Sequence, residues 1–153
     1  MSKIDRIDKR ALRDKLLSME ETSAEEARKL YDEFVGTARL DPSVPTDSGD
    51  RGVAENAAAL AASLEGQLHT HEERKQFLES LRVEPMTYVE TGALVTVNRR
   101  HLFLAVPSPL FEFQGLKILG ISHDAPLAKE MAGLTAGDTF EFHKRKFEIT
   151  AVY

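Results

Sequence analysis

Apolar residues recur at helical spacing in two long stretches of the N-terminal half. From Ile4 to Leu40 the chain lacks proline, has a single glycine and is rich in good helix formers. An apolar seam of the coiled-coil kind repeats every seven residues here, with two further apolar residues between the repeats: Leu17, Ala24, Tyr31 and Ala38, with Ala27 and Phe34. From Val53 to Leu81 apolar residues recur at spacings of three and four, which predicts a second amphipathic helix.

Two such helices joined by a loop of about ten residues are expected to pack antiparallel as a hairpin. Ser23 and Glu26 have the spacing of a capping box, which would divide the first helix near Glu20, but one continuous helix is the favoured interpretation. We therefore predict an N-terminal α-helical coiled-coil hairpin over residues 1–82.

At Arg82-Val-Glu-Pro85 the pattern changes from helical to alternating, which indicates a domain boundary. Alternating segments predict strands at 94–98, 101–106, 110–113, 116–121, 139–142 and 146–153, with a short helix at 126–131. We therefore expect a small antiparallel α+β domain over residues 84–153.

Composition narrows the class of protein. The 153 residues contain no cysteine, which excludes disulfides and thiolate metal sites and fits a reducing compartment. No apolar run is long enough to span a bilayer, so we expect a cytoplasmic protein with no membrane partner. A formal net charge of −5 argues against broad binding to duplex nucleic acid, so any such contact should be local or made inside a larger complex.

The stretch between the two helices, residues 41–55, holds three aspartates and a glutamate, and its prolines and glycines interrupt the helix. Carboxylates at the end of a hairpin are a plausible site for a hard cation such as Mg²⁺. On the residues alone, simple turn chemistry is the favoured alternative, with Asp47 or Asp50 as a helix N-cap.

The segment Ile121-Ser-His-Asp-Ala-Pro-Leu-Ala-Lys-Glu-Met-Ala-Gly-Leu-Thr-Ala-Gly-Asp138 resembles the signature of Gre-type (GreA/GreB-like) bacterial transcription elongation and transcript cleavage factors. The resemblance implies a helical hairpin that enters the secondary channel of RNA polymerase, and an FKBP-like C-terminal domain that docks on the channel rim. It implies a monomeric factor that stimulates the polymerase's own cleavage of backtracked RNA and is not itself an enzyme. Such a factor binds no cofactor alone, acts with the Mg²⁺ of the polymerase active site, and meets nascent RNA only within the complex.

The same resemblance assigns residues. The tip acids Asp50 and Glu55, with Asp47, carry the catalytic role, and Asp50 and Glu55 hold metal only in the polymerase complex. The resemblance also assigns polymerase docking to a loop at the start of the short helix, with Ser122, Asp124 and Pro126 near the docking surface. The ordinary alternative for these three is that Pro126 starts the helix while Ser122 and Asp124 serve as turn or cap residues.

The tip departs from the family pattern, because two extra residues separate Asp50 from Glu55. On a helix these acids lie about 140° apart and cannot share a cation as an i, i+3 pair does, whereas Asp47 and Asp50 restore that spacing. The alternative functions are therefore a non-catalytic regulator or inhibitor of polymerase, or a regulator of nucleoside diphosphate kinase. A prolyl isomerase rests on fold analogy alone and is discounted.

Basic residues gather at two expected hairpin turns: Arg99, Arg100, Lys144, Arg145 and Lys146. They could meet an acidic surface of the polymerase. The favoured interpretation is that they are solvated turn residues that discourage aggregation at strand edges.

Overall fold

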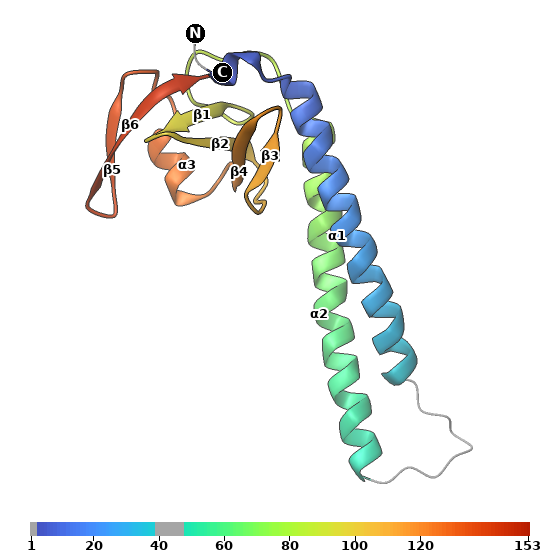
Figure 1. Cartoon of the computed structure of the whole chain (residues 1–153). Helices are drawn as coiled ribbons and strands as arrows, with labels where there is room; N and C mark the ends of the chain where they lie inside the picture. Colours follow the sequence, from blue (N-terminus) through green and yellow to red (C-terminus); the bar gives the residue numbers. More distant parts are fainter. Residues whose placement is uncertain (1–2, 39–47) are drawn as a thin grey trace. The chain divides into compact units, whose positions relative to one another are not determined.

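In the computed structural model, the backbone is described for residues 3–38 and 48–153, and the side chains for residues 3–33, 56 and 58–153. The helical hairpin is formed by α1 (Lys9–Ala38) and α2 (Ser48–Glu79), which run side by side in opposite directions (Figure 1). Ala27, Ala61 and Leu64 are buried between them. The continuous first helix is confirmed, because α1 passes through Ser23 and Glu26 without a break.

The expected start of this helix at Ile4 is wrong. Residues Lys3–Arg6 form a separate 3₁₀ turn (η1), and α1 begins at Lys9. Asp8 caps α1, because its Oδ1 accepts a hydrogen bond from the Ala11 amide at 3.1 Å and its carbonyl accepts one from the Leu12 amide at 2.9 Å. An N-cap residue has non-helical backbone, so the helix cannot extend back through Asp8.

The second half of the chain forms one six-stranded sheet with the order β3-β4-β2-β1-β6-β5. Its elements are β1 (Leu94–Val97), β2 (Arg100–Ala105), β3 (Phe111–Phe113), β4 (Leu116–Ser122), α3 (Pro126–Met131), β5 (Thr139–Phe142) and β6 (Arg145–Val152). The α+β class, with two long helices, a sheet and one short helix, is as expected from the sequence.

The sheet is mixed rather than wholly antiparallel, which corrects one detail of the expectation. Strands β2 and β4 pair in parallel, while the other four pairs are antiparallel. The chain leaves β2, forms β3 at the sheet edge, and turns back into β4 beside β2. Two reversals of direction between β2 and β4 make that pair parallel.

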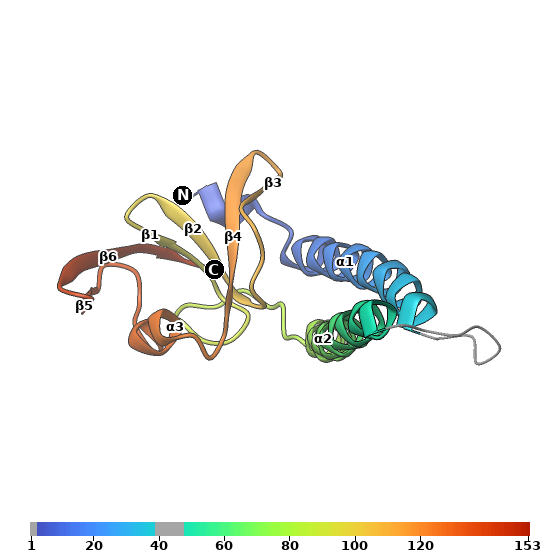
Figure 2. The ribbon, with the colours of Figure 1, turned by 90° about the horizontal axis from the view of Figure 1, so that it is seen from below.

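Successive side chains of a strand point to opposite sides of the sheet, and both sides are buried in the central strands β1 and β2. One face carries Val95, Val97, Leu102 and Leu104, which pack with α3. The other carries residues such as Leu94, Phe103 and Ile118, all fully buried. Viewed from below, α3 and η1 lie on opposite sides of β1 and β2 (Figure 2).

The chain divides into two compact units, residues 1–16 with 77–153 and residues 17–76. The foot of each long helix therefore belongs to the unit that contains the sheet. Leu12, Leu16 and Leu78 in these feet are almost completely buried. No helix in the described ranges is both long and apolar enough to cross a membrane.

Candidate functional site

The loop expected to dock on a partner joins β4 to α3. Ser122 is the last residue of β4, and its carbonyl accepts a hydrogen bond from the Ala125 amide at 3.0 Å, which closes a tight turn. The Ser122 hydroxyl donates a hydrogen bond to Oδ1 of Asp124. This hydrogen bond holds the pKa of Asp124 below its usual value of 3.8, so the exposed loop presents a fixed negative charge.

Pro126 occupies the first turn of α3, and Ala125 at the N-cap makes no side-chain hydrogen bond. Proline is well tolerated there because the first amides of a helix lack partners in any case. The structure thus brings Ser122, Asp124 and Pro126 together on one short loop. Each also has a local structural role, so the turn interpretation and the docking interpretation are compatible.

His123, which the sequence reasoning did not single out, anchors this loop. Its ring stacks on Phe77 with centroids 4.5 Å apart and planes 14° from parallel. Its amide also donates to the Ala105 carbonyl at 3.3 Å. No local pattern links His123 to Phe77, which lies 46 positions earlier in the chain, so this contact could not be found from spacing.

The rest of the family-like segment builds the turn after α3. Gly133 and Gly137 have φ of +82° and +94°, a backbone conformation that favours glycine. Asp138 accepts hydrogen bonds at Oδ2 from the Thr135 amide at 2.8 Å and the Thr135 hydroxyl at 3.2 Å. Met131 is fully buried. These residues therefore have roles that shape the fold.

The hairpin tip is only partly described. Asp47 lies outside the described residues, whereas Asp50 and Glu55 lie on the helical backbone of α2, which begins at Ser48. Five residues of helix turn through about 500°, so these two positions face about 140° apart. As a pair on this helix they do not fit a single shared Mg²⁺. No cluster of three metal-ligating side chains occurs among the residues described.

The two basic turns are tight and regular. Asn98 and Arg99 have φ of 47° and 69°, and His143 and Lys144 have φ of 51° and 63°, the positive values required by two-residue type I′ turns. Such turns place the residue after the turn directly opposite the residue before it. Arg100 therefore pairs with Val97, and Arg145 pairs with Phe142.

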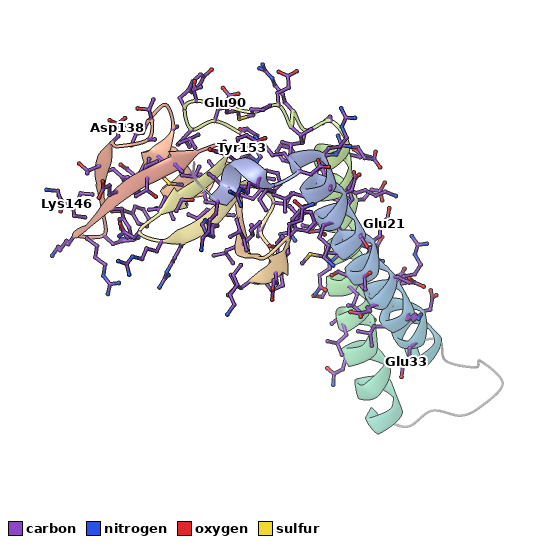
Figure 3. The ribbon with its side chains drawn as sticks, turned by 45° about the horizontal axis from the view of Figure 1, so that its top comes forward. Glu21, Glu33, Glu90, Asp138, Lys146 and Tyr153 are labelled. Atoms are coloured by element: carbon purple, nitrogen blue, oxygen red, sulfur yellow. The ribbon has the colours of Figure 1, made fainter. Side chains whose placement is uncertain are left out.

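Between these two hairpins lies a groove of about 730 Å³ on the α3 side of the sheet. Arg100, His143, Arg145 and Lys146 are among the residues that line it, and Arg99 and Lys144 are not. Figure 3 shows Lys146 beside the free end of the β5–β6 hairpin. The sequence identified the basic residues but not the groove that three of them share.

No family model and no curated protein matches this chain. Among solved structures the chain is similar to GreA factor homolog 1 (Gfh1) of Thermus thermophilus, with 18% identity over 94% of each chain and a TM-score of 0.32. It is also similar to a structure of the transcription factor Gfh1 (19% identity, 94% of this chain and 92% of that chain, TM-score 0.34). Thermus aquaticus Gfh1 is similar at 19% identity over the same shares of the two chains, with a TM-score of 0.32.

Proposed function

We propose that this protein is a bacterial transcription factor that binds RNA polymerase, places its helical hairpin in the secondary channel and stimulates cleavage of backtracked RNA. The observation that carries the proposal is the β4–loop–α3 segment. Its signature residues take up a strand, an exposed turn and a short helix, with Asp124 presented in a fixed orientation. The role places the protein in the cytoplasm, bound to polymerase as a monomer.

The hairpin supports the proposal through its length. α1 contains 30 residues and α2 contains 32. At 1.5 Å per residue each helix extends roughly 45 Å. The tip acids would contribute carboxylate oxygens, the ligand type that Mg²⁺ prefers, to an ion held mainly by the polymerase. Asp50 and Glu55 rank ahead of Asp47 for that role because they match the family's tip acids, and Asp47 stands at i, i+3 spacing from Asp50 in the sequence.

A cleavage assay on a backtracked elongation complex tests this function. We expect the wild-type protein to increase the cleavage rate, and Asp50→Asn to lose most of that increase while binding polymerase with unchanged affinity. Asparagine keeps the size of aspartate but removes its charge. Asp50 lies within the first turn of α2 and is not its N-cap, so the variant tests the carboxylate charge itself. The loss of cleavage stimulation in Asp47→Asn and in Glu55→Gln ranks the contributions of the other two acids.

A non-catalytic regulator of polymerase is the second candidate. The helical backbone at Asp50 and Glu55 favours it, because the two positions do not converge on one point. A wild-type protein that stimulates no cleavage and instead slows elongation at saturating concentration would establish this alternative and exclude the catalytic role.

Docking is tested separately from cleavage. We expect Asp124→Lys to weaken binding to core polymerase at least tenfold, since it reverses the charge that the Ser122 hydroxyl orients. Glu130→Lys is the matched control, because Glu130 is an exposed acid on the neighbouring helix α3. Its affinity should stay within about threefold of wild type. Equal affinities for Asp124→Lys and wild type, with both proteins folded, would show that the loop is not the docking site.

A further inference from the structure

The groove on the α3 side of the sheet has an apolar floor that the protein leaves partly uncovered. Helix α3 has only six residues, and it buries Ala128 and Met131 against the sheet. Beyond it, the groove is lined by apolar side chains of which five are only half-buried: Leu119, Ile121, Leu127, Phe142 and Phe147. A hollow of about 730 Å³ lies within the range of ligand-binding pockets and has room for a few large apolar side chains.

The rim of this groove is positively charged. Arg100 and Arg145 reach it because each is the cross-strand partner of an apolar lining residue, and directly paired residues share one face of a sheet. Lys146 and His143 also line it, and no lining residue in this fully described part of the chain is acidic. Within the described residues, no carboxylate lies within ion-pair distance of Arg100, Arg145 or Lys146.

This arrangement separates the basic residues into two sets. Arg99 and Lys144 occupy left-handed positions in the turns and do not line the groove, as expected for solvated residues that protect hairpin ends. Arg100, Arg145 and Lys146 border an apolar hollow instead. A partner that carries both apolar and acidic side chains can cover the apolar surface and pair with the cations beside it.

We propose that this groove binds an acidic amphipathic segment of a partner protein. Two or three apolar side chains of the segment fill the floor, and flanking Asp or Glu residues pair with Arg100 and Arg145. Guanidinium groups suit this role because two of their N–H groups can donate hydrogen bonds to the two oxygens of one carboxylate. The apolar floor and the net charge of −5 favour a protein segment over nucleic acid. The groove adjoins the Asp124 loop, because Ile121 and Leu127 of its lining lie directly before Ser122 and directly after Pro126. The proposal goes beyond polymerase docking through Asp124, since it concerns the groove itself and holds for any partner of this chemistry.

Fluorescence anisotropy on the full-length protein tests the proposal. The probe is a fluorescein-labelled peptide of twelve residues with two leucines and one phenylalanine among aspartates and glutamates. One control peptide replaces the acids with lysine, and another replaces the apolar residues with alanine. We expect the acidic amphipathic peptide to bind at least tenfold more tightly than either control, and the binding to weaken with added salt.

Two double variants that remove the same number of positive charges locate the binding site. Arg100→Gln with Arg145→Gln removes two charges from the groove, and Arg99→Asn with Lys144→Asn removes two from the turns at neighbouring positions. We expect the first pair to weaken peptide binding at least tenfold and the second pair to change it less than threefold. Leu119→Ala should weaken binding without changing its salt dependence, because it removes floor contacts only.

Three results would overturn the proposal: equal binding of the acidic and lysine peptides, equal effects of the two double variants, or binding of a single-stranded RNA oligomer with no binding of the acidic peptide. Circular dichroism and thermal unfolding of each variant establish that it is folded. Polymerase affinity measured in parallel distinguishes failure of the groove from failure of the docking loop.

Discussion

Lys9 carries its ammonium group into a buried position at the start of α1, with 3% of the residue exposed. Its Nζ donates hydrogen bonds to the carbonyls of Glu84 at 2.9 Å and Tyr153 at 2.8 Å, and lies 5.7 Å from the centre of the Tyr153 ring. Burial lowers the pKa of Lys9 from 10.5 to about 8, and the nearby charge of Glu90 opposes this only in part. One side chain thus links the foot of the hairpin to the end of β6.

This lowered pKa predicts how stability depends on pH. Between pH 8 and 10.5 the unfolded chain binds more protons at Lys9 than the folded chain, so the free energy of unfolding rises with pH across this window. The contribution is on the order of 1–3 kcal/mol. We expect urea unfolding at several pH values to show this rise in wild type and its loss in Lys9→Met, since the other titrating groups are common to both proteins. Parallel curves for the two proteins would contradict the prediction.

At the scale of elements, a buried carboxylate links α1 to α2. Glu20 of α1 has a side chain only 9% exposed, and one of its oxygens lies 2.5 Å from Nδ1 of His71 on α2. Its other oxygen lies 3.8 Å from the guanidinium of Arg74. His69, two positions before His71, instead forms an exposed pair with Glu73 on the outside of the same helix.

These two pairs give a direct comparison. We expect Glu20→Ala to destabilise the hairpin by about 1–3 kcal/mol, because it leaves the partly buried His71 and Arg74 without their carboxylate. Glu73→Ala should cost less than about 0.5 kcal/mol, because its pair with His69 is exposed to solvent. Hydrogen exchange of amides in residues 17–33 and 58–76 measures both effects. Similar exchange rates in the two variants would show that burial of Glu20 does not strengthen the contact.

The elements themselves were largely predictable from the sequence, because their signals are local. The seven-residue seam and the alternating segments located the helices and strands, and Pro126 marked the start of α3. The parallel pairing of β2 and β4 was not predictable, since it depends on where β3 lies in the finished sheet. The capping role of Asp8 was also not predictable, since it depends on the interruption of helical structure between η1 and α1.

The candidate site divides in the same way. Ser122, Asp124 and Pro126 are close in sequence, so one motif found all three. The groove draws its lining from five strands and α3, which no single stretch of sequence brings together. The positions of two basic residues at its rim were nevertheless predictable from the sequence. A two-residue turn fixes the register of a hairpin, so Arg100 opposite Val97 and Arg145 opposite Phe142 follow from the turns alone.

At the scale of the whole molecule, the contacts within the chain fall into two compact units. The sheet and the feet of both helices form one unit, which holds the loop of Ser122, Asp124 and Pro126 and also the groove. Residues 17–76 form the other unit, which leads to the acidic tip. If the proposed function is correct, affinity for polymerase and stimulation of cleavage reside in different units.

A shortened chain tests this separation. Replacing residues 17–76 with a flexible Gly/Ser linker of about five residues joins Leu16 of α1 to Phe77 in the last turn of α2. We expect the product to fold, because Leu12, Leu16 and Leu78 keep their partners within the sheet-containing unit. It should bind polymerase within about tenfold of wild type through the docking loop, stimulate no cleavage, and compete with the full-length protein. Circular dichroism, a binding titration and the cleavage assay with both proteins present measure these outcomes. Cleavage stimulation by the shortened chain would show that the hairpin tip is not the catalytic element, and a folded product with no affinity would place the docking surface on the hairpin.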